Sequence, residues 1–354
     1  MSSKEGKIRI REKNDNLNQE ERSVQKEILE SFPVNVISPT GTRCNNRCIF
    51  CTDRSPETLS HYSDLPFEKW VKLSEPLEYA TSLGLYGWGE PLFNPDYEKM
   101  FDYVVENFAG IEINITTNGI LMNGKWTEKF SSYDRLSINV SLNAANAGTY
   151  KLLSGNDQFD RIIENIRRIK DLGGKRGKGS PEIVLSFVAI KENIVELPDF
   201  VRLASNLGIR RVVVQDLIIL NEGLRAHSLT PYADFAKSIF LVALDLAKEK
   251  GILLIPFVPV YFLPTDSDAF VEDGKLERKN TAGFCHEPWT YLRISSEGEI
   301  KPCCFSDETM GNLYQEKLAE IWNGKKYRYL RKYVNSQELP EDCKRCPKKV
   351  GVTL

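Results

Sequence analysis

Apolar and β-branched residues gather in short runs from Val34 onward, and the stretches between them carry apolar positions at helical spacing. The runs cover 34–38, 82–88, 111–117, 135–142, 182–190 and 210–220. Helical spacing is found over 66–77, 95–108, 159–173, 197–208 and 231–251. Alternating strands and helices are typical of a parallel sheet with helical crossovers. Six strands therefore predict an α/β fold, a partial (β/α)6 TIM-type barrel rather than a closed eight-stranded one.

The pattern divides the chain into four predicted segments. These are a polar N-terminal extension (1–33), the barrel core (34–225), a helical segment and linker (226–283), and a small α+β domain (284–354). The extension is rich in Glu, Lys, Asn and Gln, so we expect it to be partly disordered, with a helix near 20–32. The last domain carries a hairpin pattern at 289–302 and a helical pattern at 315–334. It is too small for a large core, so a metal centre would help to stabilise it.

Composition excludes several classes of protein. The chain has 354 residues, with 47 basic against 49 acidic side chains, and this balance gives no electrostatic footprint for nucleic acid or an anionic membrane. No apolar run is long enough to span a membrane, and the charged N-terminus lacks a signal-peptide core, so we expect a cytoplasmic protein. In that compartment the eight cysteines are expected to bind metal or to react rather than to form disulfides.

Three cysteines lie close together directly after the first predicted strand. Cys44, Cys48 and Cys51 can bind three irons of a four-iron cluster, which leaves the fourth iron open for a cofactor or substrate. A structural zinc site, the alternative, needs a fourth ligand, and the nearest further Cys or His is His61. The spacing therefore favours an iron–sulfur cluster with an open coordination site.

The spacing Cys-x3-Cys-x2-Cys, with Phe50 before the last cysteine, resembles the signature of the radical S-adenosylmethionine (SAM) superfamily. The resemblance implies that a 4Fe–4S cluster binds SAM and that reductive cleavage gives a 5′-deoxyadenosyl radical. Further segments that match the family at strand ends imply cofactor-binding roles for Gly89, Glu90, Thr117, Asn118, Ser141, Asn143 and Ile190. Turn and helix-cap chemistry is an alternative for each polar residue, and core packing is an alternative for Ile190.

The C-terminal domain contains a second group of thiols. Cys285, Cys303, Cys343 and Cys346 make a four-thiolate set that suits either zinc or a 4Fe–4S cluster, and the sequence alone does not decide between them. The pattern resembles the shortened "twitch" form of the SPASM domain, as in 2-deoxy-scyllo-inosamine dehydrogenase-like enzymes, which implies one auxiliary 4Fe–4S cluster. Cys304 is left over, either as a packing thiol or as a catalytic hydrogen-atom donor.

The resemblance implies a radical SAM enzyme of the oxidoreductase or epimerase type. Its expected substrate is a small polar molecule such as a sugar or aminocyclitol, with modification of a short ribosomally made peptide as the alternative. An external donor such as flavodoxin or ferredoxin would supply the electron. Two readings without catalysis remain: an electron-transfer protein would explain the clusters but not the cofactor-binding motifs, and a zinc-bearing binding protein would not explain the three-cysteine loop.

Overall fold

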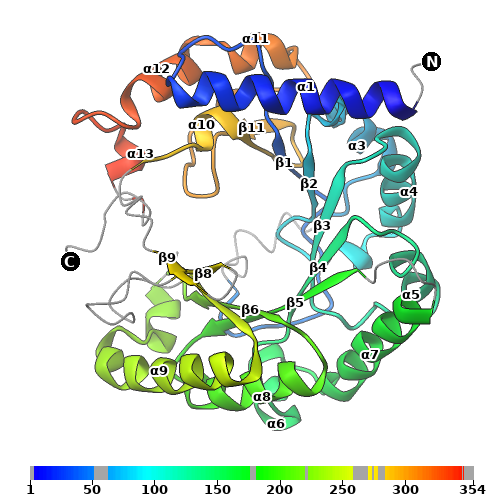
Figure 1. Cartoon of the computed structure of the whole chain (residues 1–354), viewed down its shortest axis with the longest axis vertical. Coiled ribbons are helices and arrows are strands. Elements are labelled where there is room, and N and C mark those ends of the chain that lie inside the picture. Colours follow the sequence, from blue (N-terminus) through cyan, green and yellow to red (C-terminus); the bar gives the residue numbers. More distant parts are fainter. Residues whose placement is uncertain are drawn as a thin grey trace. The chain divides into compact units, whose positions relative to one another are not determined.

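The computed structural model describes residues 4–51, 63–175, 181–219, 222–257, 270–272, 275–277, 284–344 and 346 (Figure 1). The chain forms two compact units. The first unit contains Met1–Arg43, Ser63–Ile115 and Thr281–Leu354, and the second contains Cys44–Tyr62 and Thr116–Asn280. Both units are thus assembled from separate parts of the chain, whereas the four segments expected from the sequence are consecutive. Those segment bounds remain a prediction.

A mixed sheet forms the centre of the first unit. Its strands are β1 (Asn35–Ser38), β2 (Ser82–Leu85), β3 (Glu112–Thr117, which leads into the second unit), β10 (Tyr291–Ile294), β11 (Glu299–Lys301) and β12 (Gly311–Asn312), in the order β12-β11-β10-β1-β2-β3. β10, β1, β2 and β3 are parallel, and β11 and β12 run antiparallel to their neighbours. The hairpin predicted at 289–302 therefore continues the same sheet as the first βα units.

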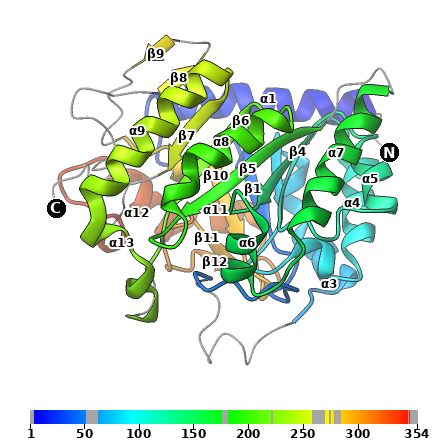
Figure 2. The ribbon, with the colours of Figure 1, turned by 90° about the horizontal axis from the view of Figure 1, so that it is seen from below.

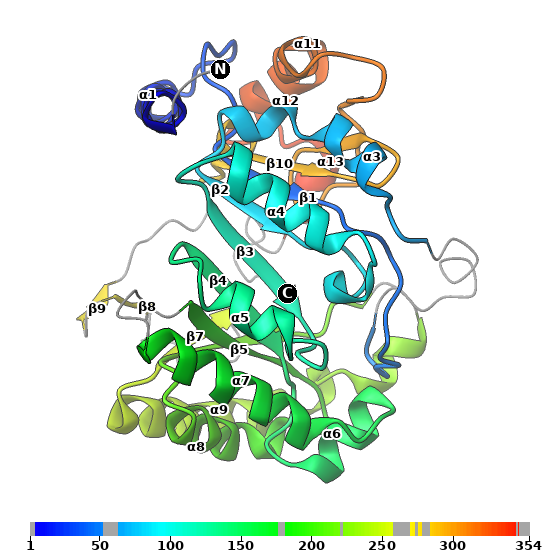
Figure 3. The same cartoon turned by 90° about the vertical axis from the view of Figure 1, so that its right-hand side faces the viewer.

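The two faces of this sheet differ in burial. One face is apolar and fully buried, with Val36, Leu83 and Leu292 each at 0% exposure. Helices α3 (Phe67–Trp70) and α4 (Tyr97–Asn107) lie beside β2 and β3 (Figure 3). The other face, which we call the open face, carries half-buried side chains that include Tyr291 and Arg293. A sheet buried on one face only leaves the second face able to receive a ligand.

Helix α1 (Lys4–Ser23) corrects the expectation of partial disorder in the N-terminal extension. It ends where the predicted helix at 20–32 would have begun, and its buried side chains are polar: Arg11, Asn14, Asn18 and Glu21. Arg11 donates to the carbonyls of Leu77 and Ala109, and Asn14 donates to those of Phe32 and Tyr79. The helix is therefore held by hydrogen bonds to loop backbone rather than by an apolar stripe.

The C-terminal part of the first unit contains α10 (Glu287–Thr290), α11 (Leu318–Trp322), α12 (Lys325–Tyr333) and α13 (Glu341–Lys344). The helix predicted at 315–334 is broken into α11 and α12, because Gly324 has extended backbone with ψ 166°. Arg331 of α12 is buried; it donates to the carbonyls of Pro288 and Glu27 and lies 4.5 Å from the centre of the Trp322 ring. Burial lowers the pKa of Arg331 to about 10.

The second unit contains four parallel strands in the order β4 (Leu136–Ser141), β5 (Glu182–Ala189), β6 (Arg211–Asp216) and β7 (Leu253–Phe257). Its helices are α5 (Lys125–Phe130), α6 (Ala147–Ser154), α7 (Phe159–Lys175), α8 (Leu197–Asn206) and α9 (Ala233–Lys250). α7, α8 and α9 lie on one side of these strands (Figures 2 and 3). The sequence analysis does not predict β7. This strand contains Pro256, and proline is tolerated in an edge strand such as this one.

The elements predicted between 34 and 220 are present, with shorter bounds for several of them. Short 3-10 turns follow α3 at Val71–Leu73 and Glu75–Glu78, and others occur at Pro91–Phe93, Ile194–Glu196, Glu222–His227 and Thr230–Tyr232. Within the expected linker, β8 (Phe270–Glu272) and β9 (Lys275–Glu277) form an antiparallel pair. The rest of the stretch at 264–283 lies outside the described residues.

Candidate functional site

The three N-terminal cysteines lie in a loop that is fastened to the end of α6. Arg47 N donates to Ser154 O at 2.8 Å, Ile49 N donates to Leu153 O at 2.9 Å, and Cys51 N turns back to Cys48 O. Asn46 is buried and donates to the Tyr150 hydroxyl. The cysteines themselves are half-buried. A loop with fixed backbone and accessible thiols suits cluster binding, because the ligands are held in place while one side stays open.

Thr117 ends β3, Asn118 directly follows it, and Asn118 lies next to this loop. Asn118 Nδ2 donates to Asn45 Oδ1 at 2.6 Å and lies 3.9 Å from Cys44 Sγ. Asn118 Oδ1 and Thr117 Oγ1 accept from the backbone amides of Ile120 and Gly119. Both side chains therefore make local turn hydrogen bonds, as the alternative interpretation expects. Asn118 also contacts the cysteine loop.

At the end of β4, Ser141 and Asn143 differ in role. Asn143 is buried with φ 61°, its Oδ1 accepts from Val188 N at 2.8 Å, and its carbonyl accepts from Asn193 Nδ2 at 2.9 Å. These bonds tie the end of β4 to the end of β5. Ser141 is half-buried, and its side chain makes no hydrogen bond with the residues that the structure describes. The Ile190 side chain is completely buried, so Ile190 could contact the cofactor only through its backbone.

In the first unit, Gly89 and Glu90 pack against the segment that leads into the cysteines. Glu90 N donates to Arg43 O at 2.8 Å, and a Cβ added at Gly89 would lie only 2.3 Å from the same carbonyl. Glu90 is buried, and its Oε1 accepts from Leu92 N at 3.1 Å. Burial, with the nearby Glu90 carboxylate, raises the pKa of Tyr97 well above its usual value. Glycine is required at position 89 because any side chain there would collide with backbone.

Sequence reasoning missed two residues that hold these loops. Asn46 is one of them. The other is Glu196, which accepts from Ala145 N at 2.9 Å and from the side chains of Asn146 and Thr149. Glu196 thereby fixes the chain directly after Asn143. Their signal in the sequence is weak, because a single Asn or Glu beside a turn is common.

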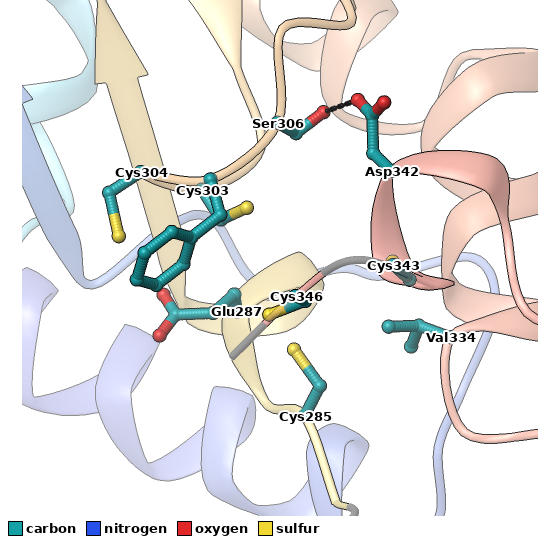
Figure 4. Close-up of a pocket in the computed structure, with 10 residues that line it drawn as sticks. Cys285, Glu287, Cys303, Cys304, Ser306, Val334, Asp342, Cys343 and Cys346 are labelled. Atoms are coloured by element: carbon teal, nitrogen blue, oxygen red, sulfur yellow. Dashed lines mark hydrogen bonds between the residues drawn. The ribbon is translucent and has the colours of Figure 1, made fainter. Parts of the chain in front are cut away.

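The four cysteines predicted to bind the second metal centre line one cavity, together with Cys304 (Figure 4). They come from three segments: Cys285 precedes α10, Cys303 follows β11, and Cys343 and Cys346 lie in and after α13. Asn335 fixes the backbone of Cys285 through two hydrogen bonds of 2.8 and 3.1 Å. The Ser306 hydroxyl donates to Asp342 at 2.6 Å and ties the second segment to the third. The fold thus brings together thiols that are up to 61 positions apart in the sequence.

The neighbouring thiols Cys303 and Cys304 point in different directions (Figure 4). Burial raises the pKa of Cys303, and hydrogen bonds from the backbone of Phe305 and Ser306 oppose that rise. Cys304 is exposed and acts electrostatically on Tyr86 and Tyr291, whose pKa values are raised first by burial. The cavity therefore has four converging thiols and a fifth that faces elsewhere.

Four thiols around one cavity form a ligand set that a 4Fe–4S cluster can use. Within the described residues, no three Cys, His, Asp or Glu side chains are arranged to hold one metal ion. Each thiolate of a 4Fe–4S cluster binds a different iron, so its ligands stand farther apart than those of a single zinc. The four thiols around the shared cavity can supply one thiolate for each iron of such a cluster.

The βα units and the two thiol groups define an α/β protein with iron–sulfur sites. Residues 38–204 match the model of the radical SAM superfamily, and residues 285–347 match the SPASM iron–sulfur cluster-binding domain. The chain therefore contains a radical SAM domain followed by a SPASM domain. The first domain binds SAM and a 4Fe–4S cluster, and the second binds auxiliary iron–sulfur.

Two curated relatives match most of the chain. An AdoMet-dependent heme synthase from Methanosarcina barkeri is 25% identical over 312 residues, covering 86% of this chain and 85% of the relative. A probable GTP 3′,8-cyclase from Saccharolobus islandicus is 28% identical over 278 residues, covering 75% and 81%. Both relatives are named for chemistry on small molecules.

Solved structures show the same fold. SuiB from Streptococcus suis, bound to S-adenosylmethionine, superposes with a TM-score of 0.67 at 18% identity, over 90% of this chain and 72% of SuiB. The anSMEcpe structure with AdoMet and a peptide has a TM-score of 0.61 at 18% identity, over 89% and 86%. The expected fold class, an α/β partial barrel with a C-terminal SPASM domain, is confirmed. No helix in the described ranges is long and apolar enough to cross a membrane.

Proposed function

We propose that this enzyme removes a hydrogen atom from a small polar molecule, such as a sugar or aminocyclitol, and completes an oxidation or an epimerisation. Cys44, Cys48 and Cys51 hold the SAM-binding 4Fe–4S cluster, with Phe50, Gly89, Glu90, Thr117, Asn118, Ser141, Asn143 and Ile190 around the cofactor. Cys285, Cys303, Cys343 and Cys346 hold one auxiliary 4Fe–4S cluster. When bound, these groups supply a 5′-deoxyadenosyl radical and an electron acceptor.

The convergence of four thiols on one cavity is the observation that carries the proposal. Of the eight cysteines in this sequence, three serve the first cluster and four serve the second, so only Cys304 remains. This count favours a single auxiliary cluster, as in the 2-deoxy-scyllo-inosamine dehydrogenase-like type. A site that can accept an electron beside the substrate favours oxidation.

Cys304 offers the other outcome. Its thiol is exposed, lines the four-thiol cavity from a direction of its own, and lies near two tyrosines. A thiol in that position can return a hydrogen atom to the substrate, which gives epimerisation. Modification of a short peptide is the runner-up, because SuiB and anSMEcpe share the fold and have been crystallised with peptides. The names of the curated relatives, which refer to heme and GTP, favour the small molecule.

The test measures iron, sulfide and zinc after anaerobic reconstitution of three proteins. The wild type should hold about eight irons, and the C44A/C48A/C51A variant should keep about four. Cys304→Ala is the matched control and should keep about eight irons, because its thiol is not a ligand. One zinc in place of four irons in the triple variant would refute the auxiliary cluster. With flavodoxin or dithionite as electron donor, the wild type should also release 5′-deoxyadenosine and the triple variant should not.

A further inference from the structure

Arg293 lies on the open face of the first unit's sheet, in the row of residues that crosses its centre. β1 is the middle strand of this row: Ile37 pairs with Gly84 of β2 on one side and with Arg293 of β10 on the other. Arg293 is half-buried, and its neighbour Leu292 faces the fully buried side. Because side chains alternate along a strand, the Arg293 side chain must point to the open face.

The guanidinium of Arg293 is positioned by an aromatic ring. Its Cζ lies 5.5 Å from the centre of the Trp88 ring, in the segment that follows β2. Trp88 is 56% exposed, which is unusual for so large an apolar side chain in a folded enzyme. Stacking on an indole fixes the plane of the guanidinium and leaves its N–H groups directed outward.

No acidic group among the described residues forms an ion pair with this arginine. Arg293 forms no ion pair and no hydrogen bond within the described part of the chain, whereas the buried Arg11 and Arg331 donate to backbone carbonyls. A half-buried cation costs free energy unless a charge or acceptor meets it. The arrangement is therefore suited to an anion supplied from outside the chain.

Two phenol groups extend the site. Tyr291 lies two positions before Arg293 on β10, and Arg293 acts electrostatically on it. Tyr86 follows β2 and interacts with Tyr291 in the same way. Burial raises the pKa of both tyrosines, so each hydroxyl stays protonated and can donate. Cys304 and Glu287, which line the four-thiol cavity, also act on Tyr291.

We propose that Arg293, stacked on Trp88 and flanked by Tyr86 and Tyr291, binds an anionic group of the substrate, either a carboxylate or a phosphate. A planar guanidinium binds two oxygens of such a group at once. The site would place the substrate beside Cys304 and the auxiliary-cluster cavity. This inference rests on the proposed function and narrows its substrate class from polar to anionic.

The test measures how anions protect Arg293 from phenylglyoxal in the anaerobically reconstituted enzyme, with modified peptides quantified by mass spectrometry. Inorganic phosphate and acetate are the probes, and sodium chloride at equal ionic strength is the reference. Arg167, an exposed residue of α7, is the control arginine. At about ten times its Kd, a bound anion should slow Arg293 modification about tenfold and leave Arg167 unchanged.

Two outcomes would overturn the proposal. In the first, phosphate and acetate slow the modification of Arg293 no more than chloride does, or they slow the modification of Arg167 by the same factor. The protection would then be an effect of ionic strength alone. In the second, SAM without added anion protects Arg293 as well as phosphate does, and the arginine then serves the cofactor's carboxylate. Trp88→Ala should weaken protection by phosphate about threefold, because the guanidinium loses its stacking partner.

This readout is independent of turnover. Failure of the proposed function would appear as no 5′-deoxyadenosine release from wild-type enzyme, while Arg293 protection would be unaffected. Failure of the anion site would appear as unprotected Arg293 in an enzyme that still cleaves SAM. The two results are therefore separable in one preparation.

Discussion

Replacing Asn18 by Ala tests whether the polar contacts of α1 stabilise the first unit. Asn18 is 1% exposed, and its Nδ2 donates to Trp289 O at 2.6 Å and to Ser31 Oγ at 3.1 Å. Asn16 lies two positions earlier in the same helix and is exposed. Asn16→Ala is therefore a matched control, because it makes the same change in helix propensity without touching a buried bond.

The expected cost follows from the groups left behind. Asn18→Ala leaves the buried carbonyl of Trp289 without this donor, which costs about 1–3 kcal/mol. Asn18 Oδ1 is itself buried without a donor among the described residues, which costs free energy in the wild type. Its removal therefore offsets part of the loss. We expect a net loss of about 1–2 kcal/mol, and a Tm roughly 1–3 °C lower than that of Asn16→Ala for a chain of 354 residues.

The assay is thermal unfolding followed by far-UV circular dichroism, under anaerobic conditions and at one scan rate for all three proteins. Equal Tm values for the two variants would refute the reasoning, because α1 would then be bound too loosely for its buried bonds to matter. A fall in both variants would point to loss of helix structure rather than to loss of the Trp289 contact.

Two further predictions concern backbone space and pH. Gly89→Ala should lower Tm and reduce iron retention, because its Cβ would meet Arg43 O at 2.3 Å. Gly174→Ala in α7 has nothing within 4 Å of its Cβ and gains helix propensity, so it should keep its iron and not lower Tm. Equal losses in the two variants would contradict the steric argument. Glu21 is buried, yet hydrogen bonds from Glu30 N, Ser31 N and Lys26 lower its pKa below the ordinary 4.5. The stability that the Glu21 carboxylate contributes is therefore complete above pH 4.5 and is lost as the pH falls through the lower pKa of the folded protein. Urea unfolding of the cluster-free protein measures this loss. The midpoint of Glu21→Gln should approach that of wild type below pH 4.5. A constant difference between them from pH 6 to 3.5 would show that Glu21 does not titrate as the contacts require.

The predicted strands and the cysteine groupings came from strong local signals. The run at 182–190 is apolar except for Glu182 and Ser186, and β5 occupies all but its last residue. The three cysteines after β1 are close in sequence, so their proximity in space needs no knowledge of the fold. Cys343 and Cys346 are paired by the same argument, but their meeting with Cys285 depends on tertiary structure that spacing alone does not determine.

Helix α1 could not be predicted because its buried face carries no apolar periodicity. Hydrophobic spacing is the main signal for a packed helix, and Arg11, Asn14, Asn18 and Glu21 imitate a solvated face. The buried polar groups of these side chains find their hydrogen-bond partners only in the folded loops. The break between α11 and α12 escaped prediction for a related reason, because a glycine inside a helical pattern is often tolerated.

The register of β10 explains why a small cysteine domain and an N-terminal helix belong to one compact unit. β10 pairs in parallel with β1, so the strand that carries Tyr291 and Arg293 is fixed by the first strand of the barrel core. α1 then binds both sides of this junction: Asn18 holds Trp289, immediately before β10, and Arg11 holds Leu77 and Ala109 in the first βα units. A substrate bound at Arg293 would therefore lie on a rigid strand, and rigid elements hold reacting groups more accurately than loops do.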